Sequence, residues 1–183
     1  MNGKRHLTPL IATLILVLAV FGAAGVSADA GANTYEYLVG SGLLCSLGPG
    51  ACPDVARAPN GDTIELAGQG TFSIHPKSVT GGGTFTHRDA AGNVLGSGTW
   101  TATQLLGFHS YGSGAAQGLP PEFTGGLVLI RVHLSAGFDA ILQVDCAIGD
   151  QIPGGAIEGV RLAVQGGLNF NEEVSGLTVF IQQ

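Results

Sequence analysis

The densest group of chemically capable side chains in the sequence lies between residues 107 and 126, in the stretch GFHSYGSGAAQGLPPEFTGG. It contains an imidazole, a phenol and a carboxylate, flanked by two aromatic rings: Phe108, His109, Tyr111, Glu122 and Phe123. Imidazole, phenol and carboxylate groups are the common general acids and bases of enzymes. Beside apolar rings, the same groups could also orient a small ligand in a binding site.

Two hypotheses of different classes follow. In the first, the protein binds a small apolar ligand, or has a structural or interaction role, and the five residues named above contribute the ligand site. In the second, the chain is a small secreted enzyme of the cyclase, isomerase or hydrolase type, in which His109 or His87 transfers a proton together with Glu122 or Tyr111. A cavity with convergent polar groups would favour the enzyme, whereas an apolar cavity without them would favour the binder.

The histidines do not form a metal-binding pattern. Four of them follow the first 28 residues: His75, His87, His109 and His133. No HExxH motif, no Cys-x-x-Cys pair and no two histidines at i, i+2 on one strand are present. Neither a G-x-S-x-G nucleophile motif nor a glycine-rich phosphate loop occurs. We therefore predict no metal and no cofactor, and the sequence assigns no catalytic residue.

A hairpin is predicted for GGGTFTHRDAAGNVLGSGTWTAT, residues 81–103, because two alternating runs flank a polar turn. Phe85, Trp100 and Ala102 should then point into the core. His87 lies at the end of that apolar face, close to the turn, where a structural role is favoured over a catalytic one. His133 alternates with Val132 and Leu134 and should face outward.

The elements that must position these residues are short strands. Alternating or apolar stretches separated by turn residues occur at residues 34–39, 62–67, 71–75, 83–89, 98–106, 127–134, 139–146, 159–165 and 176–182. They predict an all-β fold, a single antiparallel β-barrel or β-sandwich of about eight or nine strands. Between them, 107–126 is predicted as an unusually long loop, either a lid over one end of a barrel or a binding site.

The first 28 residues have the order of a signal peptide. Lys4 and Arg5 precede an apolar run from Leu10 to Phe21, and small residues end the segment. We predict cleavage after Ala28, a single all-β domain over 29–183, and a secreted or extracytoplasmic location. The apolar run is shorter than the roughly 20 residues of a transmembrane helix, so no stable membrane span is expected after cleavage.

The charge balance argues against nucleic acid as a partner. The chain has 13 acidic and 7 basic residues and a formal net charge of −6. An acidic surface repels phosphate backbones and anionic lipids, and no basic stripe with interleaved aromatic residues is present.

Three cysteines, Cys45, Cys52 and Cys146, follow the predicted leader. An exported protein meets an oxidising compartment, where disulfides persist. The glycines and proline of CSLGPGAC allow a turn that joins Cys45 to Cys52, which is the favoured pairing, with Cys146 buried at the end of its strand. A bridge from Cys146 to Cys45 or Cys52, or no bridge at all, remains open at this point.

Overall fold

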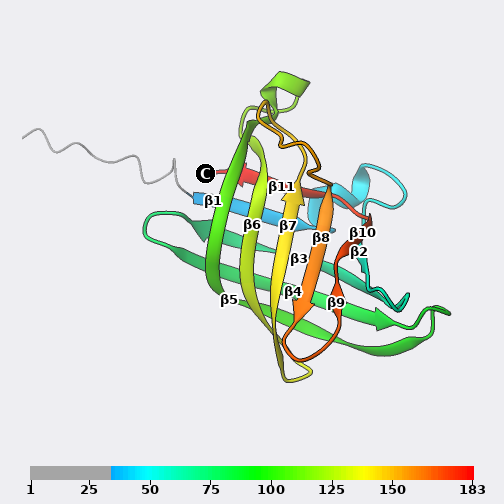
Figure 1. Cartoon of the computed structure of the whole chain (residues 1–183). Coiled ribbons are helices and arrows are strands. Elements are labelled where there is room, and N and C mark those ends of the chain that lie inside the picture. Colours follow the sequence, from blue (N-terminus) through cyan, green and yellow to red (C-terminus); the bar gives the residue numbers. More distant parts are fainter. Residues whose placement is uncertain (1–33) are drawn as a thin grey trace, which may run out of the picture.

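The computed structural model describes residues 34–183, so the predicted signal peptide lies outside the described residues and stays a prediction. Within this range the protein is all-β and antiparallel, as predicted, with eleven strands (Figure 1). No helix in this range is long and apolar enough to cross a membrane. The strands are β1 (Thr34–Val39), β2 (Asp54–Arg57), β3 (Thr63–Ser73), β4 (Ser78–Arg88), β5 (Val94–Ser113), β6 (Phe123–Leu134), β7 (Phe138–Cys146), β8 (Gly159–Val164), β9 (Asn169–Phe170), β10 (Glu172–Ser175) and β11 (Thr178–Gln182). Two 3-10 helices are η2 (Gly42–Ser46) and η3 (Gly114–Gln117).

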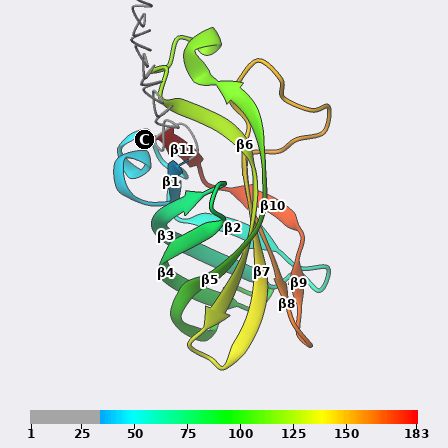
Figure 2. The same cartoon turned by 90° about the vertical axis from the view of Figure 1, so that its left-hand side faces the viewer.

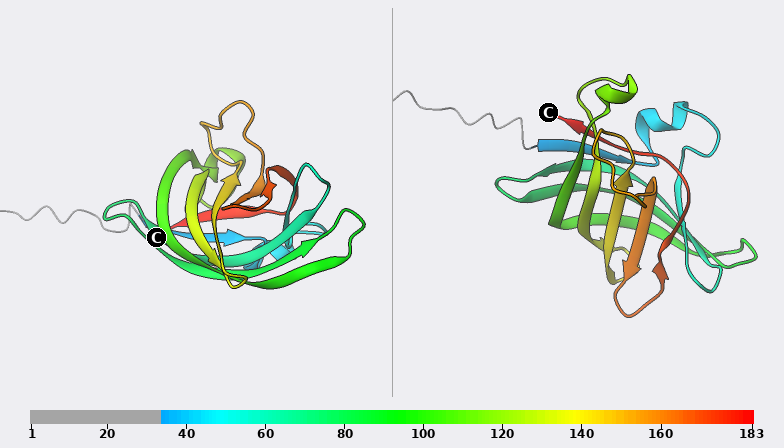
Figure 3. Two further views of the ribbon diagram at one scale, coloured as in Figure 1. Left: turned by 60° about the horizontal axis from the view of Figure 1, so that its bottom comes forward. Right: turned by 45° about the horizontal axis from the view of Figure 1, so that its top comes forward.

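The strand pairing returns on itself. β3 pairs with β4, β4 with β5 and β5 with β6, and β6 connects back to β3 through β11 and β1. A second route runs from β6 through β7, β8 and β9. β9 continues through Asn171 into β10, which pairs with β2 and so returns to β3. Figure 2 and the left panel of Figure 3 show the curvature of the long strands.

Alternation along the strands divides side chains between the interior and the outside. In β6, Val128, Ile130 and Val132 are buried, whereas Arg131 and His133 are exposed. The outward position predicted for His133 is therefore confirmed. Burial of one apolar face per strand is the main favourable contribution to such a fold.

The hairpin predicted for residues 81–103 is also confirmed. β4 and β5 pair antiparallel, and Phe85, Trp100 and Ala102 belong to the main core. The turn is fixed by the carboxylate of Asp89, which accepts hydrogen bonds from the backbone N–H groups of Ala91 and Asn93. An aspartate at this position of a turn commonly makes such bonds.

The prediction of a long loop over 107–126 is wrong. Residues 107–113 complete β5, η3 forms the connection, and β6 begins at Phe123, so the segment is mostly a paired hairpin. Three register shifts interrupt the pairing of β5 with β6. Bulges destroy the period-2 pattern that identifies a strand, and glycines at 107, 112, 125 and 126 made the segment resemble a loop.

Other strand boundaries differ for a similar reason. The stretches 62–67 and 71–75 form one strand, β3, which continues through Gly68 and Gly70. A Cβ atom at Gly68 would collide with the Trp100 indole, and one at Gly70 with the Thr80 carbonyl oxygen. These glycines serve close packing between strands, not a turn. The short strands β2, β9 and β10 were not predicted.

The favoured disulfide is confirmed. Cys45 and Cys52 are bonded, with their Cα atoms 5.1 Å apart, and the bridge closes the segment that contains η2. Cys146 is free and fully buried in the main core, which excludes its pairing with either of the others. The bridge indicates an oxidising, extracytoplasmic environment.

Candidate functional site

An apolar pocket of about 300 Å³ opens at one end of the sheet interior. Strands β3 to β9 all contribute to its wall, together with the β6–β7 and β8–β9 turns. These turns lie at the bottom of Figure 1, and the left panel of Figure 3 brings this end forward. We call it the His87 end. Its apolar wall includes Ile64, Phe85, Leu134, Val164 and Phe170.

The pocket exists because small residues occupy inward positions near the end of β5. Trp100 fills its position completely, and the space at Gly98 is occupied by the Phe85 ring and the Ser135 hydroxyl. At Gly96, two residues further along the same face, a Cβ atom would meet nothing within 4 Å. Since Gly96 lines the pocket, the missing side chain leaves room for a ligand.

His87 alone among the twelve lining residues has a polar side chain. It lies on β4, where its neighbours in register are Ile64 of β3 and Gly96 of β5. Its ring stands edge-on to the Phe170 ring, with centroids 5.4 Å apart and an interplanar angle of 84°. Gly96 adds no side chain beside it, so part of the imidazole faces the pocket.

Asp62 fixes the orientation of that imidazole. The Nε2 atom of His87 lies 3.1 Å from Oδ2 of Asp62, and the Asp62 side chain is only 12% exposed. The aspartate is held in turn because its backbone N–H donates to Oδ1 of Asn60 and its carbonyl accepts from the Ala58 N–H. An ionised carboxylate can only accept, so this contact favours the tautomer with the proton on Nε2.

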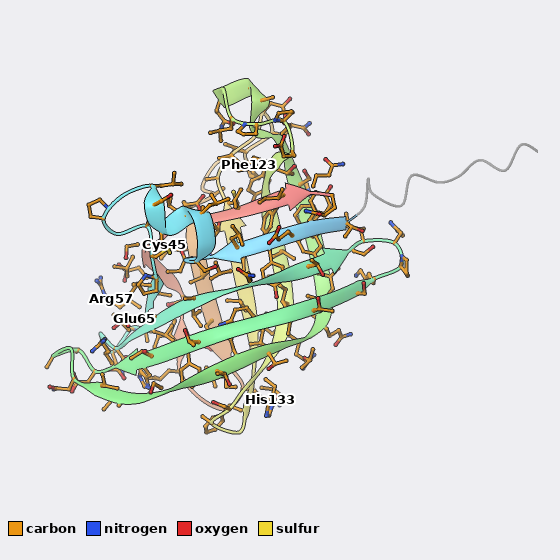
Figure 4. The ribbon with its side chains drawn as sticks, turned by 180° about the vertical axis from the view of Figure 1, so that it is seen from behind. Cys45, Arg57, Glu65, Phe123 and His133 are labelled. Atoms are coloured by element: carbon orange, nitrogen blue, oxygen red, sulfur yellow. A yellow bond between two sulfur atoms is a disulfide. The ribbon has the colours of Figure 1, made fainter. Side chains whose placement is uncertain are left out.

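The residues predicted for a ligand site lie elsewhere, and none of them lines this pocket. Phe108 belongs to an aromatic cluster in the core, with its ring centroid 4.9 Å from that of Tyr35, 4.8 Å from Phe72 and 5.4 Å from Phe180. We call this region the aromatic end. Figure 4, seen from behind, places Phe123 toward the top and His133 at the bottom, with Cys45 between them in height.

The other four do not converge with Phe108. Tyr111 is buried, and burial together with nearby Asp145 raises the pKa of its hydroxyl to about 12. His109 is exposed and touches Tyr111 edge-on, at 5.8 Å between ring centroids. Glu122 is exposed, and Phe123 lines a separate apolar cavity of about 150 Å³. The structure therefore brings His109 and Tyr111 together, but Glu122 does not join them. None of the three lines the pocket at the His87 end.

Tyr111 is covered by the segment between β7 and β8, residues 147–158. The backbone N–H of Gly149 in this segment donates to Oε1 of Gln117, and the N–H of Gln151 donates to the Tyr111 carbonyl. This segment and η3 stand together at the top of Figure 2. Because this segment covers Tyr111, the phenol has little access to a ligand and its role is structural.

Buried carboxyl groups form a second feature that the sequence did not reveal. Asp54 is fully buried, and neither of its carboxyl oxygens has a hydrogen-bond partner among the described residues. Burial raises the pKa of Asp54 to about 8, and the nearby Glu158 carboxylate adds to the effect. Glu158 itself accepts hydrogen bonds from the Ala147 and Thr178 N–H groups and from the Thr178 hydroxyl.

The described residues contain no cluster of three or more His, Cys, Asp or Glu side chains that could hold a metal ion. Instead, two histidines pair individually with carboxylates. His87 contacts Asp62, and Nδ1 of His133 lies 2.8 Å from Oδ1 of Asp139 on the exposed outer surface. His87 of the first pair lines the apolar pocket, whereas Asp139 of the second pair lines a separate pocket of about 360 Å³ beside Arg131 and Gln165.

No family model, curated protein or solved structure matches the chain. The geometry of the His87 end is therefore the feature of this protein that points to a function. Sequence reasoning identified His87 as a candidate but could not find Asp62, because the two residues are 25 positions apart and meet only through the pairing of β3 with β4.

Proposed function

We propose that this protein is an exported β-barrel module that binds a small apolar ligand in the pocket at the His87 end. The observation that carries the proposal is a cavity of about 300 Å³ whose twelve lining residues are all apolar except one. Ligand pockets commonly fall between about 300 and 1,000 Å³ and combine an apolar lining with few polar groups. The site proposed here therefore lies at the opposite end of the interior from the 107–126 segment, where the sequence predicted it.

The strand arrangement supports this proposal. If the closed circuit of strand pairing is treated as a barrel, the pocket lies at its open mouth. The mouth of a β-barrel is a usual location for a ligand site. The Cys45–Cys52 bridge and the leader pattern of residues 1–28 both favour export. Intact-mass measurement of the secreted protein tests the cleavage after Ala28, and a mature form that begins at Met1 would contradict it.

A matched pair of glycine substitutions tests the binding function. Gly96→Phe places a ring in the pocket, whereas Gly107→Phe adds the same ring on β5 outside the residues that line it. Neither glycine has a positive φ, and a Cβ atom meets nothing within 4 Å at either position. Naphthalene, followed by its fluorescence, is a suitable apolar probe.

We expect the unmodified protein and Gly107→Phe to bind naphthalene with similar affinity, and Gly96→Phe to lose at least about tenfold because the ring occupies the same space. Circular dichroism checks that both variants remain folded. If the unmodified protein does not bind the probe, or if Gly96→Phe binds as well as Gly107→Phe, the proposal fails.

An enzyme is the second candidate, and the contact of His87 with Asp62 favours it. An imidazole oriented by a carboxylate is the usual arrangement of a general base and its positioning group. The probe substrate 5-nitrobenzisoxazole fits an apolar site and opens when a base removes its ring proton. Turnover faster than that of free imidazole, lost in both His87→Leu and Gly96→Phe, would support the enzyme. Turnover no faster than free imidazole would favour simple binding.

A further inference from the structure

His87 is the single polar side chain that lines the pocket, and its contact with Asp62 indicates which ring nitrogen can accept a hydrogen bond from a ligand. Nε2 of His87 is engaged with Asp62. Nδ1 makes no hydrogen bond to any of the described residues. In the tautomer that the Asp62 contact favours, with the proton on Nε2, Nδ1 carries a lone pair and acts as an acceptor. Its natural partner is a hydroxyl or N–H donor.

The apolar surroundings of His87 increase the contribution that a hydrogen-bond donor at Nδ1 would make to ligand affinity. The other eleven lining residues have no polar side-chain atom, and the His87 side chain is 27% exposed. A ligand that fills the pocket removes this imidazole from water. An apolar ligand would then leave Nδ1 without a hydrogen bond, whereas a ligand with a donor at that point would replace the lost water.

The charge of the site argues against a carboxylate ligand. An acceptor at Nδ1 repels an anionic oxygen, and the Asp62 carboxylate lies directly behind the ring. Nearby Arg88 does not offset this charge, because its guanidinium is paired with Glu65 at 2.7 Å. The donor group of the ligand should therefore be neutral.

The volume limits the apolar part of the ligand. A dry cavity of about 150 Å³ admits benzene. The pocket here is about 300 Å³, roughly twice that size. A fused bicyclic ring or a short branched hydrocarbon is therefore a suitable size for the apolar part of the ligand.

We infer that the ligand is a neutral amphiphile, with a bicyclic-sized apolar body in the pocket and one hydroxyl or N–H group that donates to Nδ1 of His87. This inference rests on the proposed binding function and specifies the ligand class of the same site. It makes His87 a specificity residue and Asp62 a positioning residue that fixes its tautomer.

Three naphthalene derivatives of similar size test it: 2-naphthol, 2-methylnaphthalene and 2-naphthoate, titrated at neutral pH into the unmodified protein. We expect 2-naphthol to bind about tenfold more tightly than 2-methylnaphthalene, which is the usual value of one hydrogen bond. We expect 2-naphthoate to bind more weakly than 2-methylnaphthalene. In His87→Leu the preference for 2-naphthol over 2-methylnaphthalene should disappear, and circular dichroism checks that the variant is folded.

A second variant distinguishes an acceptor from simple shape. His87→Gln keeps a side-chain oxygen that can accept a hydrogen bond and should retain part of the 2-naphthol preference. If the unmodified protein binds 2-methylnaphthalene as tightly as 2-naphthol, or if His87→Leu keeps the preference, the ligand class is wrong while the binding function stands. If none of the three compounds competes with naphthalene for the pocket, the binding function itself fails.

Discussion

The two ends of the sheet interior are built by the same alternation of inward side chains, yet one is filled and the other is open. At the aromatic end, the rings of Tyr35, Phe72, Phe108 and Phe180 contact one another from different strands. At the His87 end, the position at Gly96 has no side chain, and a cavity results. Residue size at a few inward positions therefore decides which end is filled and which is open.

Two buried aspartates differ in how their charge is compensated. Asp62 at the His87 end has an imidazole partner. Asp54 belongs to a group of carboxyls with Glu158, close to the segment that covers Tyr111, and has no such partner. Burial without a partner favours the neutral form of a carboxyl group, so its protonation contributes to the free energy of unfolding.

The largest expected effect concerns this proton. The pKa of Asp54 is raised from 3.8 to about 8, which corresponds to roughly 6 kcal/mol in the free energy of unfolding. The folded protein binds the proton more tightly than the unfolded chain, so the contribution of Asp54 to stability is fully present below about pH 4 and is lost as the pH rises to about 8. Urea unfolding at about pH 5 and pH 8 measures this decline.

Asp54→Asn replaces the neutral acid with a neutral amide, and we expect it to remove most of the decline. Glu122→Gln, which removes an exposed carboxylate at the surface, is the control and should follow the unmodified protein. An Asp54→Asn variant that loses stability as steeply as the unmodified protein would show that another group is responsible.

The next effect compares one phenylalanine from each end. Phe108→Ala should cost about 3 kcal/mol, because it removes a ring that contacts three others and leaves a cavity in the core. Phe138→Ala at the pocket rim should cost less than about 1 kcal/mol, because that side chain is 49% exposed. Denaturant unfolding of both variants measures the difference, and equal costs would contradict the distinction between a filled and an open end.

Removing the disulfide should affect the stability but not the pocket. Replacing both Cys45 and Cys52 with Ala should lower the free energy of unfolding by about 2 to 3 kcal/mol, the value for a bridge that closes a short loop. Since neither cysteine lines the pocket, naphthalene affinity should be unchanged in the folded variant. A large loss of affinity would indicate that the segment closed by the bridge and the pocket are coupled.

The smallest effects come from adding one methyl group to a glycine at each end. Gly70→Ala should destabilise by about 1 to 2 kcal/mol, because the new Cβ atom collides with the Thr80 carbonyl oxygen. Gly96→Ala should stabilise by about 0.5 to 1 kcal/mol, since the Cβ atom has open space and the unfolded chain loses freedom. Thermal unfolding of the two variants should shift in opposite directions, and shifts of the same sign would refute the contrast.

Strand alternation made parts of this fold predictable. The stretches 127–134 and 139–146 lie in β6 and β7, and His133 is exposed and Cys146 buried, as predicted. The hairpin of residues 81–103 and the Cys45–Cys52 bridge were also predictable, because both depend on contacts between residues close in sequence. The continuation of β5 through 107–113 was not, because its register shifts remove the alternation.

The candidate site shows the same limit. The sequence placed His87 at the end of an apolar face, and the structure confirms that position. The pocket around it also needs Ile64, Leu134 and Phe170, which are far apart in the chain. The sequence emphasised the group from Phe108 to Phe123 instead, because its reactive side chains are crowded in one short segment.

The sequence by itself determined the all-β class, the inward and outward faces of its regular strands, and the short-range disulfide, because each follows from local periodicity or spacing. Only the tertiary structure decided which inward positions are filled, that Asp62 reaches His87 across two strands, and that Asp54 is buried without a partner. The physical reason is that burial, cavity volume and pKa depend on neighbours brought together by long-range strand pairing, and no local pattern of residues specifies those neighbours.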